Sequence, residues 1–256
     1  MKCNFPILEH DHDPNAIIHP SAWLDPVENI PERAVLCFFQ EVIAASCGDG
    51  KAELPHHLGS EIGKNPLYVL THGGQRIVVM HPGVGAPLAA GFLEELIYLG
   101  VRKVIVCGGA GVLDGDIVAG HVVVPERALR DEGTSYHYLP PAREVCADPR
   151  AVDAIKATLD AHIVPYRLGK TWTTDAIYRE TRSKVTRRRA EGCLTVEMEA
   201  AAFFAVAQFR GIALGQMLYG GDDVSGEIWD ERDWIHGHAS TRTKLFWLAI
   251  EAVLRL

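Results

Sequence analysis

The sequence predicts a three-layer αβα domain with a central mixed, largely parallel sheet, and three observations support this prediction. Short β-branched runs alternate with helical patterns along the chain. Glycines or carboxylates follow four of the predicted strands, as is common where ligands bind at the carboxyl ends of an α/β sheet. The chain has 256 residues, of which 48% are apolar, and can bury a substantial core.

We expect one structural domain overall. Residues 1–60, an N-terminal segment with the first helix, are expected to pack on an α/β domain of residues 61–256, because no repeat, low-complexity tract or flexible linker separates them.

Five apolar runs are predicted to be buried strands. They are Ile77–Met80, Val104–Cys107, Val122–Val124, Leu194–Val196 and Ala213–Leu218.

Four helices are predicted between and after these strands. The apolar face of Pro87–Leu99 ends at Gly100, and Asp148 and Pro149 provide an N-cap and first turn for a helix towards His162. Residues 197–210 and 241–254 are the other two helices. Strands and helices at this spacing favour right-handed crossovers.

Charge and hydropathy exclude two classes of partner. The net charge is −8 and the pI is about 5.8, which disfavours nucleic acids and anionic membranes as partners. The longest run without Asp, Glu, Lys or Arg, residues 77–93, is interrupted by prolines and glycines and cannot span a membrane. The N-terminus lacks an apolar signal region, so we expect a cytoplasmic protein.

No metal centre is expected. The six cysteines show no CxxC spacing, and Cys107 and Cys193 lie in or beside apolar segments, which favours thiol packing over metal or redox chemistry. Residues 10–13, His-Asp-His-Asp, could chelate a metal, but an N-terminal segment is more often solvated. The run Arg187–Arg189 is predicted to be a solvated helix face.

Two glycine-rich loops follow predicted strands. One contains Gly83 and Gly85, and the other contains Gly108 and Gly109. Glycines there allow a phosphate or sugar to approach the backbone, although tight turns beneath helices explain them equally well. Neither loop matches a dinucleotide-binding or triphosphate-binding motif.

Three carboxylates follow apolar segments. Glu197 and Glu199 are expected in an apolar helix, where they need partners and point about 200° apart, or where the helix dipole favours them. Asp222 follows a strand and two glycines, so it could act as a general acid, with Asp223 as its rival, or form an Asx turn.

Two segments, residues 131–138 and 171–181, mix aromatic rings with hydrogen-bonding groups. Such a mixture suits a flat heterocycle, but surface loops whose rings pack on the core are an equal alternative.

Four of these features, taken in order, resemble the nucleoside phosphorylase superfamily. They are GVGAP at Gly83–Pro87, GGAG at Gly108–Gly111, VEMEAA at Val196–Ala201, and Asp222. The resemblance covers about residues 65–255, and the blocks DEGTSYHYLPP and TTDAIYRET are similar to a uridine-phosphorylase-like branch. It implies the phosphorylase/hydrolase-like fold.

The resemblance also implies an activity. The family cleaves the N-glycosidic bond of a purine or uridine nucleoside with phosphate, giving free base and ribose 1-phosphate. It implies no cofactor, with inorganic phosphate as co-substrate, and a homo-oligomer, either a dimer or a hexamer.

The roles of individual residues follow by similarity. Glu199 and Asp222 would be catalytic, with Glu199 on the ribose hydroxyls and Asp222 protonating N7 of a purine. Ribose contacts are implied for Glu197, Met198 and Glu199; base contacts for Trp172, Thr173, Arg179 and Glu180, with Trp172 stacking; and phosphate or nucleophile contacts for Gly83, Gly85, Gly108 and Gly109.

The sequence departs from the family pattern at the phosphate site. Val106 and Gly109 stand where the phosphorylases have an arginine and a serine or threonine, and the N-terminal GDPxR loop is missing. Four arginines could supply the charge instead: Arg33, Arg76, Arg130 and Arg179. Thr181 and Ser183 stand near the positions of the uracil-reading glutamine and arginine. Two alternatives therefore remain open, a nucleosidase that uses water and a non-catalytic nucleoside-binding protein.

Overall fold

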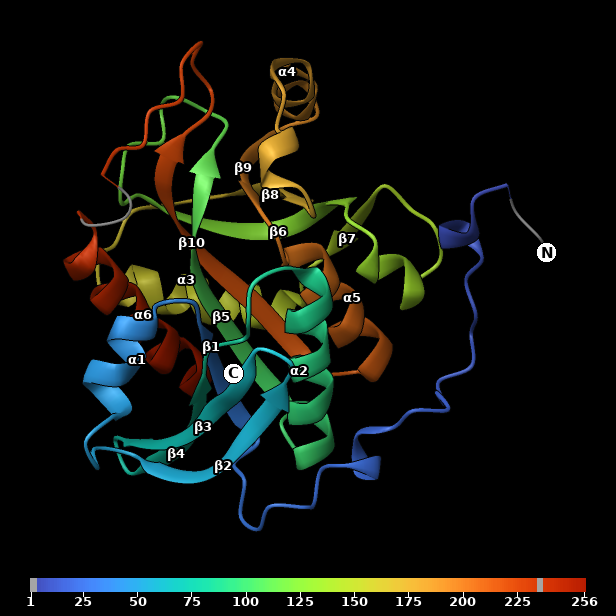
Figure 1. The fold of residues 1–256 in the computed structure, drawn as a ribbon. Coiled ribbons are helices and arrows are strands. Elements are labelled where there is room, and N and C mark those ends of the chain that lie inside the picture. Colours follow the sequence, from blue (N-terminus) through green and yellow to red (C-terminus); the bar gives the residue numbers. More distant parts are fainter. Residues whose placement is uncertain (1–3, 234–236) are drawn as a thin grey trace.

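One mixed sheet lies between two layers of helices (Figure 1). The computed structural model describes residues 4–233 and 237–256. The strands are β1 Arg33–Cys37, β2 Glu53–Ser60, β3 Gly63–His72, β4 Gln75–Met80, β5 Lys103–Val112, β6 Val122–Asp131, β7 Glu144–Cys146, β8 Tyr166–Thr174, β9 Cys193–Glu197 and β10 Ala213–Asp223.

The helices cover both faces of this sheet. They are α1 Gln40–Cys47, α2 Ala86–Leu99, α3 Pro149–Ala161, α4 Arg182–Ala190, α5 Ala200–Arg210 and α6 Ala239–Arg255, with short 3-10 turns η1 Pro6–Leu8, η2 Pro20–Ala22, η3 Thr134–His137 and η4 Ile177–Arg179. Helices α2 and α5 pack together in one layer, and α6 packs with α3 and α1 in the other. The predicted three-layer αβα class is confirmed.

Strand β5 is the branch point of the sheet. Its first half, residues 103–107, pairs with β1 on one side and β10 on the other. Its end, Gly111 and Val112, pairs instead with β9. Strands β10, β6, β8, β9 and β5 therefore close into a ring, while β1, β4, β3 and β2 extend from β5. The glycine-rich loop 108–111 lies where the partners change.

Parallel pairing brings several strand ends to one edge. Strands β4, β1, β5 and β10 are parallel neighbours, so the loops that follow them gather at the same side of the sheet. This edge is the location the sequence predicts for ligand binding.

All five predicted strands are present, within β4, β5, β6, β9 and β10. Strands β3, β7 and β8 were not predicted, and neither was β1, which lies in residues 1–60 and is hydrogen-bonded between β4 and β5. Those first residues therefore supply a central strand as well as the first helix. Strand β2 has mostly exposed side chains and no apolar run, so periodicity could not have indicated it.

The helix predictions hold with one correction. Helix α2 ends at Gly100, which adopts φ +115°, and the Asp148 side chain accepts a hydrogen bond from the Arg150 amide at the start of α3. Helix α5, however, begins at Ala200 and not at residue 197. Glu197 is the last residue of β9, so the prediction that both glutamates lie within the helix is wrong.

Two other predictions concern buried residues. Among the described cysteines, which exclude Cys3, all are free and all but Cys146 are buried. Arg188 is also buried, with its guanidinium paired to Asp131 and Glu191, so the run 187–189 is not a fully solvated face. None of the helices in the described residues has the length and apolar character that crossing a membrane requires.

Gly215 lets α3 pack closely on β10. A Cβ atom at this position would lie 2.9 Å from the Ala151 Cβ and 3.1 Å from the Ile155 Cδ1. We expect Gly215→Ala to lower the free energy of unfolding by about 1–3 kcal/mol through overpacking.

Thermal unfolding followed by circular dichroism measures this loss. Gly59→Ala is the matched control, because a Cβ there meets nothing within 4 Å. Equal melting temperatures for the two variants would contradict the packing argument.

Candidate active site

Three carboxyl groups and two glycine-rich loops meet at the common edge of the sheet. Strand β9 ends at Glu197, and Glu199 is the N-cap of α5. Strand β10 carries Asp222 near its end, beside the end of β5. The structure thus brings together the carboxylates that the sequence singled out.

Glu197 is a buried carboxylate that organises the start of α5. Its Oε2 accepts hydrogen bonds from the backbone amides of Glu199 (2.7 Å) and Ala200 (2.6 Å). Its Oε1 accepts one from the Thr173 hydroxyl at 2.6 Å. Burial raises the pKa of Glu197 to about 7, against the opposing effect of these donors. Glu197 therefore supports the segment that carries Glu199.

Glu199 connects α5 to the loop before α2. Its Oε1 accepts a hydrogen bond from the Gly85 amide at 2.6 Å. Burial, strengthened by the negative charge of Glu197, raises the pKa of Glu199 to about 8. Met198, between the two glutamates, is half-buried. A buried carboxyl group with few protein partners can bind hydroxyl groups of a ligand and stabilise a neighbouring positive charge.

The loop that holds Glu199 requires glycine. Gly83 has φ +80°, and a Cβ there would lie 2.5 Å from the Leu88 Cδ2 atom. Gly85 has φ +89°, which turns its amide towards Glu199.

Asp222 is half-buried next to β5. Gly111 lies beneath this carboxylate: a Cβ there would be 3.4 Å from the Asp222 Oδ1, an ordinary contact, and 3.0 Å from the Val196 Cγ1, a tight one. The Oδ2 atom accepts a hydrogen bond from the indole nitrogen of Trp229 at 2.7 Å. Asp223, the rival candidate, instead pairs with Arg232 at 2.5 Å. Asp222 is the aspartate with an oxygen left for a ligand in this arrangement.

Glu180 lies close to Asp222. Burial and the negative charge of Asp222 raise the pKa of Glu180 to about 7, while Lys184 acts in the opposite direction. Arg179, the residue before it, is exposed at the end of η4.

Trp172 and Thr173 lie in the interior. The Trp172 side chain is 0% exposed, and its indole nitrogen donates to Asp131 at 3.0 Å. The Thr173 hydroxyl donates to Glu197 and accepts from the Ala201 amide. In this structure neither side chain offers a surface to a base, and Thr173 instead supports the carboxylate cluster.

Aromatic rings flank the second glycine loop. A Cβ at Gly108 would lie 3.0 Å from Phe38, and one at Gly109 would lie 3.1 Å from the Tyr219 ring. Gly109 itself is exposed, whereas Val106 is buried in β5. A side chain at residue 109 would thus collide with Tyr219, which explains the glycine there.

Arg179 lies beside Glu180, whereas the other three arginines considered for phosphate have different contacts. Arg33 and Arg76 lie at the beginnings of β1 and β4, away from the site, and Arg130 binds the carbonyls of residues 139 and 140. A different arginine, Arg242, reaches Tyr219, whose hydroxyl accepts from its Nε at 3.1 Å.

Two cavities lie near this edge. One, of about 410 Å³, is bordered by polar side chains: Gln40, Glu41, Asn65, Tyr68 and His81. Burial lowers the pKa of His81, whose Nδ1 accepts from the Gly83 amide at 3.0 Å.

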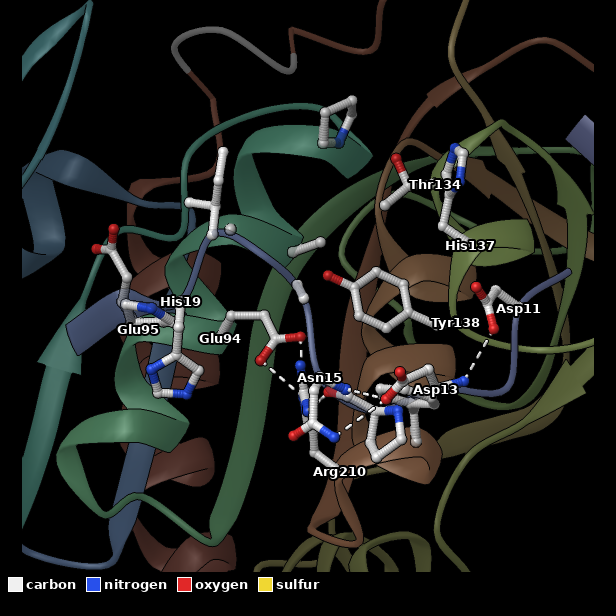
Figure 2. A pocket seen from close by; sticks show the side chains of 18 of the residues that line it. Asp11, Asp13, Asn15, His19, Glu94, Glu95, Thr134, His137, Tyr138 and Arg210 are labelled. Carbon is white, nitrogen blue, oxygen red and sulfur yellow. Dashed lines mark hydrogen bonds and ion pairs between the residues drawn. The ribbon is translucent and has the colours of Figure 1, made fainter. Parts of the chain in front are cut away.

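The larger cavity, of about 840 Å³, lies between the N-terminal segment on one side and α2, η3 and α5 on the other (Figure 2). Arg210 binds Glu94 at 2.9 Å and the Pro14 carbonyl at 3.1 Å, which fixes that segment. This cavity does not include the three carboxylates. In residues 4–233 and 237–256, no group of three or more His, Cys, Asp or Glu is arranged to hold a metal ion, and this range includes residues 10–13.

A family model described as the phosphorylase superfamily matches residues 32–251. The chain belongs to the phosphorylase superfamily. It is 30% identical over 145 residues to a guanosine phosphorylase of Halorubrum lacusprofundi and 32% identical over 172 residues to a uridine phosphorylase of Treponema pallidum. These matches span 57% and 62% of this chain, and 60% and 67% of the respective relatives.

Solved structures share the superfamily fold. A uridine phosphorylase of Vibrio fischeri superposes with a TM-score of 0.74 at 24% identity, covering 89% of this chain and 92% of that one. A purine nucleoside phosphorylase of Toxoplasma gondii gives 0.75 at 21% identity, with 89% and 93% covered. An AMP nucleosidase of Bacteroides thetaiotaomicron gives 0.71 at 19% identity, with 89% of each chain covered.

Three residues near the site were not singled out from the sequence: Phe38, Tyr219 and Trp229. Phe38 follows an unpredicted strand, and Tyr219 reads as one more apolar residue of its strand. Trp229 reaches Asp222 only because the chain reverses between them. A tryptophan seven residues after a candidate acid is the one available signal.

The carboxylate cluster predicts a pH-dependent stability. The pKa values of folded Glu197 and Glu199 lie above the value near 4.5 of an unfolded glutamate. Their contribution is therefore complete below about pH 4.5 and is lost as the pH rises through 7–8. The free energy of unfolding of the wild type should therefore fall between pH 6 and pH 9. For Glu199→Gln this fall should be smaller by about 2 kcal/mol.

Denaturant unfolding at both pH values provides the measurement. The exposed Glu61→Gln serves as control and should follow the wild type. A Glu199→Gln variant with the wild-type pH dependence would show that Glu199 is not buried in its uncharged form.

Proposed function

We propose that this protein is a nucleoside phosphorylase, which cleaves the N-glycosidic bond of a purine or uridine nucleoside with phosphate to give free base and ribose 1-phosphate. The proposal includes a cytoplasmic homo-oligomer, a dimer or a hexamer, that needs no cofactor besides phosphate as co-substrate.

The observation that carries this proposal is the position of Glu199. Its carboxyl group is buried at the edge where the glycine loops meet, and it accepts a hydrogen bond from the Gly85 amide. Such a group can bind the 2′ and 3′ hydroxyls of ribose, and as a carboxylate it stabilises the positive charge that develops on the sugar. Met198, half-buried beside it, would pack on the ribose.

Asp222 supports departure of the base. It lies next to β5 with Oδ1 above Gly111, near the half-buried Glu180. A carboxylic acid there can protonate N7 of a purine as the glycosidic bond breaks. Arg179 and Glu180 are the residues we propose for base contacts, and Trp172 is not, because its ring is fully buried.

The glycine loops are proposed to bind the phosphate. Gly85 and the exposed Gly109 leave backbone accessible at this edge. Arg242 brings a positive charge to the Tyr219 hydroxyl beside Gly109, and it is also paired with Glu41 at 3.0 Å.

Hydrolysis is the second candidate, and one observation favours it. Val106 is buried, and the Tyr219 ring occupies the space next to Gly109. At these two positions the phosphorylases that this sequence resembles have polar side chains. A nucleosidase would let water attack the ribose instead of phosphate.

One assay separates these functions. Base release from inosine and uridine is measured with the purified protein in phosphate-free buffer and in 10–50 mM phosphate. Release that requires phosphate supports the proposal. Release at the same rate without phosphate favours the nucleosidase, and no release with measurable nucleoside binding favours a binding protein.

Glu199→Gln should lower kcat for base release by about 10²–10³-fold, because a glutamine cannot ionise as positive charge develops on the sugar, whereas the glutamate can. The melting temperature at pH 6 should stay close to the wild-type value, since the amide oxygen can still accept from Gly85. Wild-type turnover in the folded variant would remove Glu199 from the active site.

Asp222→Asn keeps the shape of the side chain but cannot deliver a proton. We expect inosine cleavage to fall by about 10²-fold or more, while uridine, which has no N7, should be far less affected. Parallel losses for both nucleosides, together with a lower melting temperature, would instead indicate that Asp222 only stabilises its turn.

A further inference from the structure

A short hairpin follows the strand that carries Asp222. Its base is closed by two backbone hydrogen bonds between Asp223 and Asp230, of 2.7 and 3.0 Å. The Asp223 carboxylate also accepts from the Ser225 amide at 2.7 Å. Residues 223–230, called the hairpin below, therefore have a defined shape although several of their side chains are exposed.

Three arginines attach the hairpin to the rest of the chain. Arg182, at the start of α4, donates to the carbonyls of Gly226 and Glu227. Arg189 donates to the Ser225 carbonyl at 3.3 Å. Arg232 joins the Asp223 carboxylate to the Ile117 carbonyl at 2.8 Å. These contacts fix the hairpin relative to α4 and to the loop after β5.

Because the hairpin is fixed, its Trp229 contacts Asp222 from a defined direction. The Trp229 indole donates to Oδ2 at 2.7 Å, and Gly111 lies beneath both carboxylate oxygens, 3.4 and 3.5 Å from where its Cβ would be. Trp229 is 55% exposed, so burying its ring in the core cannot be the main reason for its position. A hydrogen bond to a carboxylate from a fixed donor both orients the group and favours its ionised form.

Glu180 is a neighbour of the same carboxylate, whose negative charge acts on it. It lies two residues before Arg182, which is bound to the hairpin. Asp222 on β10 and Lys184 on α4 are the charged groups that face it. The negative charge of Asp222 therefore favours the protonated form of Glu180, which keeps a proton available beside Asp222.

We propose that Glu180 and Asp222 act as one acid pair for the leaving base, and that Trp229 is the positioning residue that orients Asp222 within it. This inference rests on the proposed function and narrows its substrate to nucleosides whose base leaves more easily when a ring nitrogen is protonated, which are the purine nucleosides.

The bond from the ribose C1′ to N9 breaks, and its electron pair stays with the purine. An O–H bond of the pair breaks as N7–H forms, so the base leaves neutral and the pair keeps one additional negative charge. An oxygen of phosphate or water bonds to C1′ and its O–H proton is released to solvent, from which the pair takes back one proton.

The test compares Trp229→Phe and Glu180→Gln with the wild type, using inosine and 7-methylinosine. The methylated base carries a fixed positive charge and needs no proton to leave. Both variants should lower kcat for inosine by about 10-fold with little change in KM, and should change kcat for 7-methylinosine by less than about twofold. Ile228→Ala, an 84% exposed residue of the same hairpin, is the control and should match the wild type.

The pH profile of kcat for inosine gives a second measure. The acid must be protonated, so activity falls on the alkaline side. Trp229→Phe removes the donor that favours the ionised form, which should shift this limb to higher pH, whereas Glu180→Gln should shift it to lower pH.

The outcomes separate the inference from the proposed function. If the wild type cleaves neither nucleoside, the proposed function fails. If the wild type is active, equal losses on both nucleosides, or unshifted pH profiles in both variants, would overturn the acid pair alone and indicate a structural role.

Discussion

The hydrogen bond between the Gly85 amide and the Glu199 carboxyl group is the contact on which the site depends. It joins the loop after β4 to the start of α5, two segments more than a hundred residues apart in the chain. Burying a carboxyl group is unfavourable unless it is paired or hydrogen-bonded. The structure offsets part of this cost at Glu197, which receives two backbone amides and the Thr173 hydroxyl. Glu199 keeps fewer partners and a pKa near 8. The part of the burial cost that is not offset by hydrogen bonds therefore lies mainly at Glu199.

The branched sheet explains why these groups meet. Strand β5 leaves β1 for β9 at its glycine-rich end, so Gly111 lies between Val196 and Asp222. The same crossing brings the end of β9, with Glu197, close to the end of β10. In a regular open sheet, β9 and β10 would pair with different strands instead of both pairing with β5. The glycines of residues 108–111 thus have a packing role that is independent of any ligand, and a ligand role for the exposed Gly109 adds to it.

Local patterns in the sequence predicted five of the ten described strands and the edge that carries the site, because buried strands and helix caps depend on neighbouring residues. The predictions failed where distant contacts decide. Glu197 was expected in a helix, but pairing of β9 with β5 and β8 extends the strand to that residue. Trp172 was expected at a base, yet its ring is buried beside Val185 and Cys193. Trp229 reaches Asp222 through a hairpin held by arginines from other elements, which no periodicity indicates.

The central claim is that Glu199 recognises the ribose hydroxyls at the point where positive charge develops. Comparing kcat/KM for inosine and 2′,3′-dideoxyinosine with the wild-type protein tests it most directly. A buried carboxyl group that loses its hydroxyl partners is left unpaired, so the account predicts a fall in kcat/KM of at least about 10²-fold for the dideoxy compound. Equal values for the two nucleosides would contradict the account, because the sugar would then be bound without its hydroxyl groups being recognised.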